Sequence, residues 1–177
     1  MMRPLPIEEI PRLTPEAYRQ SEKYPFVVVL DNIRSRNNVG SVFRTMDAFA
    51  GTCIYLCGFT PQPPHRDIHK TALGAEQTVS WEHRTSTQEL LQQLRKQGYQ
   101  TIALEHTDQS RALQAFTFVP KQPYALVFGN EVKGVSHEAL QHCDTALEIP
   151  QFGTKHSLNI SVSVGVTLWH LVQQAYL

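Results

Sequence analysis

Short runs of β-branched and other apolar residues recur along the chain, and the stretches between them have the spacing of amphipathic helices. The runs predict strands at 26–31, 52–57, 100–105, 124–129 and 146–150. Helices are expected at 39–50, 86–98 and 136–142, with a short helical piece at 111–116. Strands that alternate with helices in this way are typical of an α/β fold, with a mostly parallel sheet and helices on both faces.

Two segments are harder to assign from the pattern. Residues 70–81 match neither period well. Residues 158–166 alternate apolar and polar positions, which by itself indicates a strand, but the segment that continues to Leu177 is long and ends with helical spacing. We therefore favour a helix. On such a helix Ser157, Ser161 and Gly165 recur at steps of four, and this small-residue face would let another helix pack closely, within the fold or across a dimer.

The first 25 residues differ from the rest, because they are rich in proline and charge. Thr14 is a good helix cap, Pro15 suits the first helical position and Glu16 suits the positive end of a helix. We expect residues 1–25 to form an arm that lies on the surface of a single domain, residues 26–177.

The composition of the chain limits how it could bind nucleic acid, metals or membranes. Sixteen basic residues balance sixteen acidic ones in a chain of 177 residues, so nucleic acid would have to bind to a local patch and not through bulk charge. Three cysteines without a CxxC pair predict buried free thiols in preference to a zinc site, and no metal is expected. The N-terminus lacks a signal-peptide pattern, and no apolar run approaches the roughly 20 residues of a membrane helix. We expect a soluble cytoplasmic protein that does not bind membranes.

Three blocks carry the candidate chemistry: NNVGSVFR at 37–44, FGNEVKG at 128–134 and IPQFGTKHSLN at 149–159. Each follows a predicted strand and combines glycine with functional side chains. Because ligands bind beyond the carboxyl ends of parallel strands, the blocks predict one active site built from loops at that edge of the sheet.

The three blocks resemble, in order and context, the three motifs of the SpoU (TrmH-like) family of SPOUT RNA methyltransferases. The stretches KTALGAE and IALE are also similar, so the likeness runs from about residue 26 to the C-terminus. The resemblance implies that a methyl group is transferred from S-adenosylmethionine to a ribose 2′-hydroxyl of RNA. It also implies a C-terminal trefoil knot and a homodimer. The residues that carry the likeness are Asn38, Gly40, Arg44, Gly129, Glu131, Gly134, Ile149, Pro150, Gly153, Ser157, Leu158 and Asn159.

By the same resemblance the catalytic residues are Arg44, Asn38, Glu131, Ser157 and Asn159. The family's arginine is proposed to deprotonate the hydroxyl, but arginine gives up its last proton very reluctantly. We favour Arg44 as an electrostatic stabiliser that also grips an RNA phosphate, and leave proton removal open. Asn38 caps a helix that starts at residue 39, positions Arg44, or both. Glu131 would hold Arg44 or a partner chain's backbone, and Ser157 would cap the last helix or face the ligand.

The cofactor pocket of the family is formed largely by backbone groups. Carried over residue by residue, it comprises Leu104, Gly129, Ile149 and Leu158. A local basic patch is expected to contact RNA, through Arg34, Arg36, Arg66, Lys70, Lys133 and Lys155.

The motifs do not identify which class of RNA is the substrate. A near-minimal catalytic domain favours tRNA, because minimal members of the family commonly act there, and rRNA remains the alternative. A non-catalytic RNA-binding or assembly protein that keeps the fold is the rival class. Another kind of nucleotide-binding enzyme is disfavoured, because the sequence lacks a Walker lysine motif, GxGxxG and GxSxG.

Overall fold

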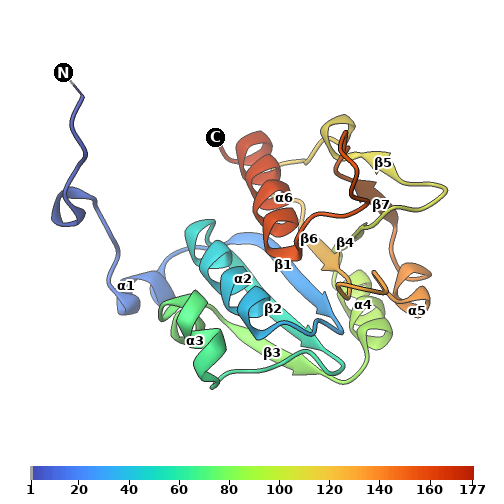
Figure 1. Ribbon diagram of the computed structural model, residues 1–177, viewed down its shortest axis with the longest axis horizontal. Helices are drawn as coiled ribbons and strands as arrows, with labels where there is room; N and C mark the ends of the chain where they lie inside the picture. The colour runs from blue at the N-terminus through green and yellow to red at the C-terminus, as the bar shows by residue number, and fades with distance from the viewer. Residues whose placement is uncertain (1) are drawn as a thin grey trace.

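The computed structural model describes residues 2–177, with the backbone alone described at Ile7. Within this range a seven-stranded sheet runs in the order β3-β2-β1-β6-β4-β7-β5, and every neighbouring pair is parallel (Figure 1). The predicted parallel α/β sheet is therefore confirmed. The strands are β1 Tyr24–Asp31, β2 Gly51–Cys57, β3 Trp81–Arg84, β4 Gln100–Leu104, β5 Arg111–Ala112, β6 Tyr124–Phe128 and β7 Thr145–Glu148.

Helices cover both faces of this sheet, as the alternating pattern predicts. Helices α2, α3 and α6 contribute to one hydrophobic cluster, and α4 and α5 contribute to the cluster on the opposite face. The α-helices are α1 Pro15–Gln20, α2 Arg36–Ala48, α3 Arg66–Ala72, α4 Thr87–Lys96, α5 His137–Leu140 and α6 Ile160–Ala175. Short 3-10 turns are η1 Ile7–Glu9, η2 Ala75–Gln77 and η3 Leu113–Ala115.

Strand β1 shows why these residues form the centre of the sheet. Phe26, Val28 and Leu30 point into the first cluster, and Val27 and Val29 point into the second. All five side chains are buried. A continuous β-branched run is what a strand covered on both faces requires, so β1 lies in the core and its carboxyl end is held rigidly.

Two helices begin at residues other than those expected. Helix α2 starts at Arg36 because the Ser35 side chain caps it by accepting from the Asn38 backbone N–H at 3.2 Å. Asn38 is therefore not the cap. The last segment is a helix, but it begins at Ile160, where the Asn159 side chain is the cap. The alternative that Ser157 caps it is wrong, since Ser157 lies before the helix.

The two edges of the sheet are formed by residues that the pattern did not assign as strands. Residues 70–81 contain the end of α3, η2 and the start of β3. The short helical piece expected at 111–116 is confirmed only for Leu113–Ala115, which form the 3-10 turn η3, whereas Arg111 and Ala112 pair with β7 as the short strand β5. Pairing with a neighbouring strand outweighed the local helical spacing there.

At the N-terminus, Thr14 accepts a hydrogen bond from the Ala17 N–H and starts α1 as predicted. Tyr18 is buried, and the Arg19 guanidinium donates to the Gln77 carbonyl at 3.0 Å, which attaches α1 to the domain. The chain before α1 extends away from the sheet (Figure 1). The first residue of the predicted arm lies outside the described range, and the division at residue 25 stays a prediction.

None of the helices within the described range is long and apolar enough to cross a membrane. The same residues contain no group of three or more His, Cys, Asp or Glu side chains placed to hold a metal ion. The three cysteines are free, and burial raises the pKa of each thiol to about 12, so all three stay protonated near neutral pH. The trefoil knot implied by the resemblance stays a prediction.

Candidate active site

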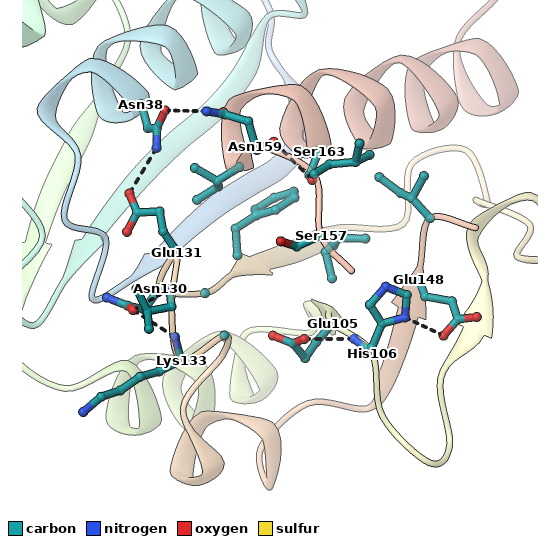
Figure 2. A pocket seen from close by; sticks show the side chains of 18 of the residues that line it. Asn38, Glu105, His106, Asn130, Glu131, Lys133, Glu148, Ser157, Asn159 and Ser163 are labelled. Carbon is teal, nitrogen blue, oxygen red and sulfur yellow. Dashed lines mark hydrogen bonds and ion pairs between the residues drawn. The ribbon is translucent and has the colours of Figure 1, made fainter. Parts of the chain in front are cut away.

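A cavity of about 520 Å³ lies at the carboxyl edge of the sheet (Figure 2). Its walls come from the start of α2, from the ends of β4, β6 and β7, and from the residues that lead into α6. All three sequence blocks contribute to these walls. The strand order explains this convergence, because β6 lies between β1 and β4 and β7 follows β4.

Glu131 joins the second block to the first. Its carboxylate accepts from the backbone N–H of Arg34 at 2.9 Å and of Ser35 at 3.0 Å, and from the Asn38 side-chain amide at 3.1 Å. These donors immediately precede α2 or lie in its first turn. Glu131 therefore fixes the loop between β1 and α2, and does not hold Arg44 as one expectation had it.

Asn38 and Asn159 join the first block to the third. The Asn159 amide donates to the Asn38 side-chain oxygen at 3.2 Å (Figure 2). The Asn159 side-chain oxygen accepts from the Ser161 N–H at 2.8 Å. The result is a continuous chain of hydrogen bonds through Glu131, Asn38 and Asn159. It positions the start of α6 relative to the start of α2.

The ionisation of Glu131 follows from these contacts. Partial burial on its own raises the pKa of this carboxyl, but the backbone donors of Arg34, Glu131 and Ser35, together with the Asn38 amide, outweigh it. The pKa of Glu131 consequently lies below its ordinary value. Glu131 is a carboxylate at neutral pH, and hydrogen bonds to a charged acceptor are the stronger kind.

At two motif positions only glycine fits, because other parts of the chain lie too close for a side chain. A Cβ at Gly129 would collide with the backbone of Gly134 and Val135, where the loop after β6 folds back on itself. A Cβ at Gly40 would collide with Thr71 and with the carbonyl of Ile68, so Gly40 lets α2 pack on α3. The partner of Gly40 is thus another helix, and not a ligand or a neighbouring strand.

The four expected cofactor residues come together. Leu104, Gly129, Ile149 and Leu158 all line the cavity and lie at the ends of β4, β6 and β7 and before α6. Ser157 also lines the cavity (Figure 2) and is exposed. Apolar side chains at strand ends suit a nucleoside whose ring is enclosed by the protein.

Several further residues line the cavity that sequence reasoning did not single out. Glu105 accepts from the Val135 and His106 N–H groups at 2.8 and 3.0 Å, and the His106 ring contacts Glu148 at 3.1 Å. Hydrogen bonds from Ser110 and His106 lower the pKa of Glu148. The signal for Glu105 was its place as the last residue of the strand predicted at 100–105. Glu105, Glu131 and Glu148 give the cavity negative charge, which suits a cationic ligand.

Arg44 lies elsewhere. It is exposed on α2, does not line the cavity, and its guanidinium makes no hydrogen bond or ion pair with any residue in the described range. The expected contacts of Arg44 with Asn38 and Glu131 are therefore not formed within one copy of the chain.

The predicted RNA-binding residues are all exposed, and they lie in three places. Lys133 lines the cavity, and Arg34 is linked to its wall through Glu131. Arg66 and Lys70 lie on α3, which packs against α2. The remaining members, away from the cavity lining, are Arg36 at the start of α2 and Lys155 before α6.

The parallel sheet and the cavity formed by loops at its carboxyl edge define an α/β protein with a nucleotide-type site. The family model of the SpoU rRNA Methylase family matches residues 25–169, and the chain belongs to this family.

Among curated relatives, the 23S rRNA (guanosine-2′-O-)-methyltransferase RlmB of Neisseria meningitidis is 31% identical over 144 residues, covering 81% of this chain and 56% of that protein. The tRNA (guanosine(18)-2′-O)-methyltransferase TARBP1 of Mus musculus is 31% identical over 153 residues, covering 85% of this chain and 10% of that protein. The chain thus spans less than two thirds of these relatives.

Solved structures show the same fold. The A. aeolicus TrmH/SpoU tRNA modifying enzyme superposes with a TM-score of 0.79 at 25% identity, covering 89% of this chain and 78% of that chain. The AdoMet-bound rRNA methyltransferase from Sinorhizobium meliloti has a TM-score of 0.79 at 25% identity, covering 88% and 59%.

Proposed function

We propose that the protein is an S-adenosylmethionine-dependent methyltransferase that methylates a ribose 2′-hydroxyl in RNA, with tRNA as the first candidate substrate. The observation that carries this proposal is the hydrogen-bonded chain of Glu131, Asn38 and Asn159. It joins all three motifs at the rim of one cavity, an arrangement that a protein keeping only the fold would not need. The names of the RNA-methylating relatives support the same reaction.

The residues of the cavity fit the cofactor. Leu104, Ile149 and Leu158 would enclose the adenosine, and Glu105 and Glu148 give an acidic wall that suits its positive charge. When bound, S-adenosylmethionine supplies a methyl group on a cationic sulfur. The chain's own task is to align the ribose hydroxyl and to stabilise the negative charge that develops on its oxygen. Ser157 and Asn159 lie at the cavity and would orient the ribose.

The same proposal includes a homodimer. Val162, Val166 and Trp169 are 49%, 39% and 53% exposed and recur on one face of α6, and a Cβ at Gly165 would meet nothing within 4 Å among the described residues. An apolar stripe of this kind favours burial against another protein surface. A second copy of α6 fits a stripe that also contains a small residue. We expect Trp169→Lys to shift the protein from dimer to monomer in sedimentation velocity, and an unchanged dimer would exclude this face.

A dimer also gives Arg44 a place in the chemistry. Arg44 is exposed on α2 and has no partner among the described residues, and α6 is joined to this helix through Asn38 and Asn159. It would grip an RNA phosphate and stabilise the developing charge in the partner's cavity. If so, a mixture of Arg44→Ala and Asn159→Ala chains should recover part of the activity that each variant lacks alone, because mixed dimers contain one intact site.

The decisive experiment is transfer of labelled methyl groups to tRNA and, separately, to rRNA from cells that lack the gene, followed by nucleoside mass spectrometry. A labelled 2′-O-methylnucleoside in the tRNA pool would support the whole proposal. Label in rRNA alone would identify rRNA, and not tRNA, as the substrate. Absence of label from both pools, with calorimetric binding of S-adenosylmethionine, would favour the non-catalytic RNA-binding alternative. A cytoplasmic location belongs to the same proposal, because RNA substrates of both kinds are found there.

A further inference from the structure

A second cavity, of about 540 Å³, lies on the β3 side of the sheet and shares no lining residue with the first. Its walls come from the loop before α3, from α3 and η2, and from the first residue of β3. In Figure 1, α3 and β3 lie on the opposite side of the molecule from β7. The cavity is therefore separate from the proposed methyl-transfer site.

The walls of this cavity combine flat apolar surface with polar groups. Pro63, Pro64 and Trp81 form the apolar part, and Trp81 is half-buried because it also packs against the core. Arg66 stands at the cavity with its side chain 92% exposed, and its Nε also pairs with Asp67 at 3.3 Å. A base stacked on an aromatic side chain, with an exposed cation near its phosphate, is how proteins hold unpaired nucleotides.

Glu76 gives the cavity a specific chemical requirement. Its side chain is only 8% exposed, and Oε1 contacts the His69 ring at 2.6 Å. The other oxygen, Oε2, is buried and receives no hydrogen bond from any part of the chain that the structure describes. A buried carboxylate oxygen without a donor is costly, and such a group calls for a partner. Because an ionised carboxylate only accepts, the missing partner must be a donor.

We propose that this cavity binds a guanine base of the RNA, at a nucleotide other than the one that is methylated. Guanine presents two adjacent donors, N1–H and the exocyclic amine, and a single carboxylate can accept both. Adenine and cytosine offer one amine, and uracil one N–H. The base would stack on Trp81 with its donor edge toward Glu76, and Arg66 would contact its phosphate. The inference rests on the proposed function, because it takes RNA as the substrate.

The test uses the full chain labelled with 5-fluorotryptophan, in which Trp81 and Trp169 give two fluorine resonances that Trp81→Phe assigns. We expect GMP to shift the Trp81 resonance and not that of Trp169. IMP, which lacks the exocyclic amine, should bind about tenfold more weakly, and Glu76→Gln should lower the affinity for GMP by about tenfold or more. The matched control is Glu138→Gln, which removes an exposed carboxylate on the opposite face of the sheet.

Equal affinities for GMP and IMP on the unmodified chain would overturn the proposal without any variant. So would a Trp81 resonance that GMP leaves unchanged at millimolar concentration. Total tRNA should shift the same resonance more tightly than GMP does, and a response to GMP without a response to tRNA would mean a site for free nucleotide instead. Methyl transfer is assayed separately, so an active enzyme with an unresponsive Trp81 refutes this inference alone, and an inactive one with a responsive Trp81 refutes the reaction alone.

Discussion

Replacement of Glu131 by glutamine tests the hydrogen-bonded chain directly. Glutamine keeps the shape of the side chain but has one carbonyl oxygen and an amide that donates. The carboxylate accepts three hydrogen bonds, from two backbone groups and from Asn38. In Glu131→Gln, some of these donors would face another donor.

The magnitude follows from the hydrogen bonds that the substitution removes. Hydrogen bonds to a charged group contribute roughly 1.5–3 kcal/mol each when well buried. Glu131 is exposed, so solvent competes and the expected loss is smaller, about 1–2 kcal/mol in the free energy of unfolding. Urea unfolding measures this difference, and Glu138→Gln, an exposed carboxylate without an ion pair among the described residues, should change it by less than about 0.5 kcal/mol.

The pH dependence of the same difference has a definite sign. The pKa of Glu131 is lowered in the folded protein, so its stabilising contribution is fully present above the ordinary value of 4.5. It is lost as the pH falls through the folded-state pKa. The difference in the free energy of unfolding between the wild type and Glu131→Gln should therefore be constant from pH 6 to 8 and become smaller in acid.

Methyl transfer by Glu131→Gln should fall about tenfold or more, since the loop that Glu131 fixes leads into the start of α2, which carries Asn38. A variant with unchanged stability and unchanged activity would refute the structural role given to this chain of hydrogen bonds.

Other substitutions test separate parts of the site. Arg44→Ala should abolish methyl transfer and leave calorimetric binding of S-adenosylmethionine unchanged, because Arg44 lies outside the cavity; loss of cofactor binding would contradict this role. Gly129→Ala should cost about 3 kcal/mol or prevent folding, because its Cβ meets backbone, and Gly153→Ala is the control, since nothing lies within 4 Å among the described residues. Lys133→Ala should weaken RNA binding and reduce the slope of log affinity against log salt by about 0.7–0.9, measured by filter binding, whereas an unaltered slope would remove this lysine from the RNA surface.

The sheet was predicted well because buried parallel strands consist of unbroken runs of apolar residues, which are easily recognised in a sequence. Strand β1 is the clearest case, with five consecutive buried residues from Phe26 to Leu30. Edge elements were predicted poorly. Strand β5 has two residues, Arg111 and Ala112, and exists only because β7 lies beside it. Periodicity within the chain carries no information about such a partner.

The residues that line the cavity could be predicted where motifs lie at strand ends. The hydrogen bonds between their side chains could not. Glu131 was expected to hold Arg44 or a partner chain's backbone, and within one copy of the chain it holds the loop before α2. Helix starts decided this, because Ser35 begins α2 one turn earlier than expected and turns Asn38 toward Asn159. Those shifts of a few residues arise from side-chain caps, for which several neighbouring residues compete equally well in sequence.

The strand order also has a consequence for synthesis of the protein. Strand β1 can pair with β2 early, but on its other side Phe26 pairs with Tyr124 of β6. Asn159, which completes the chain of hydrogen bonds at the cavity, follows later still. On the ribosome the first three strands can associate while the rest of the chain is absent, yet one long edge of β1 stays open until β6 emerges. Contacts so distant in sequence are slow to form. The nascent chain therefore has an exposed apolar strand edge for most of its synthesis, a period in which chaperones would protect it from aggregation.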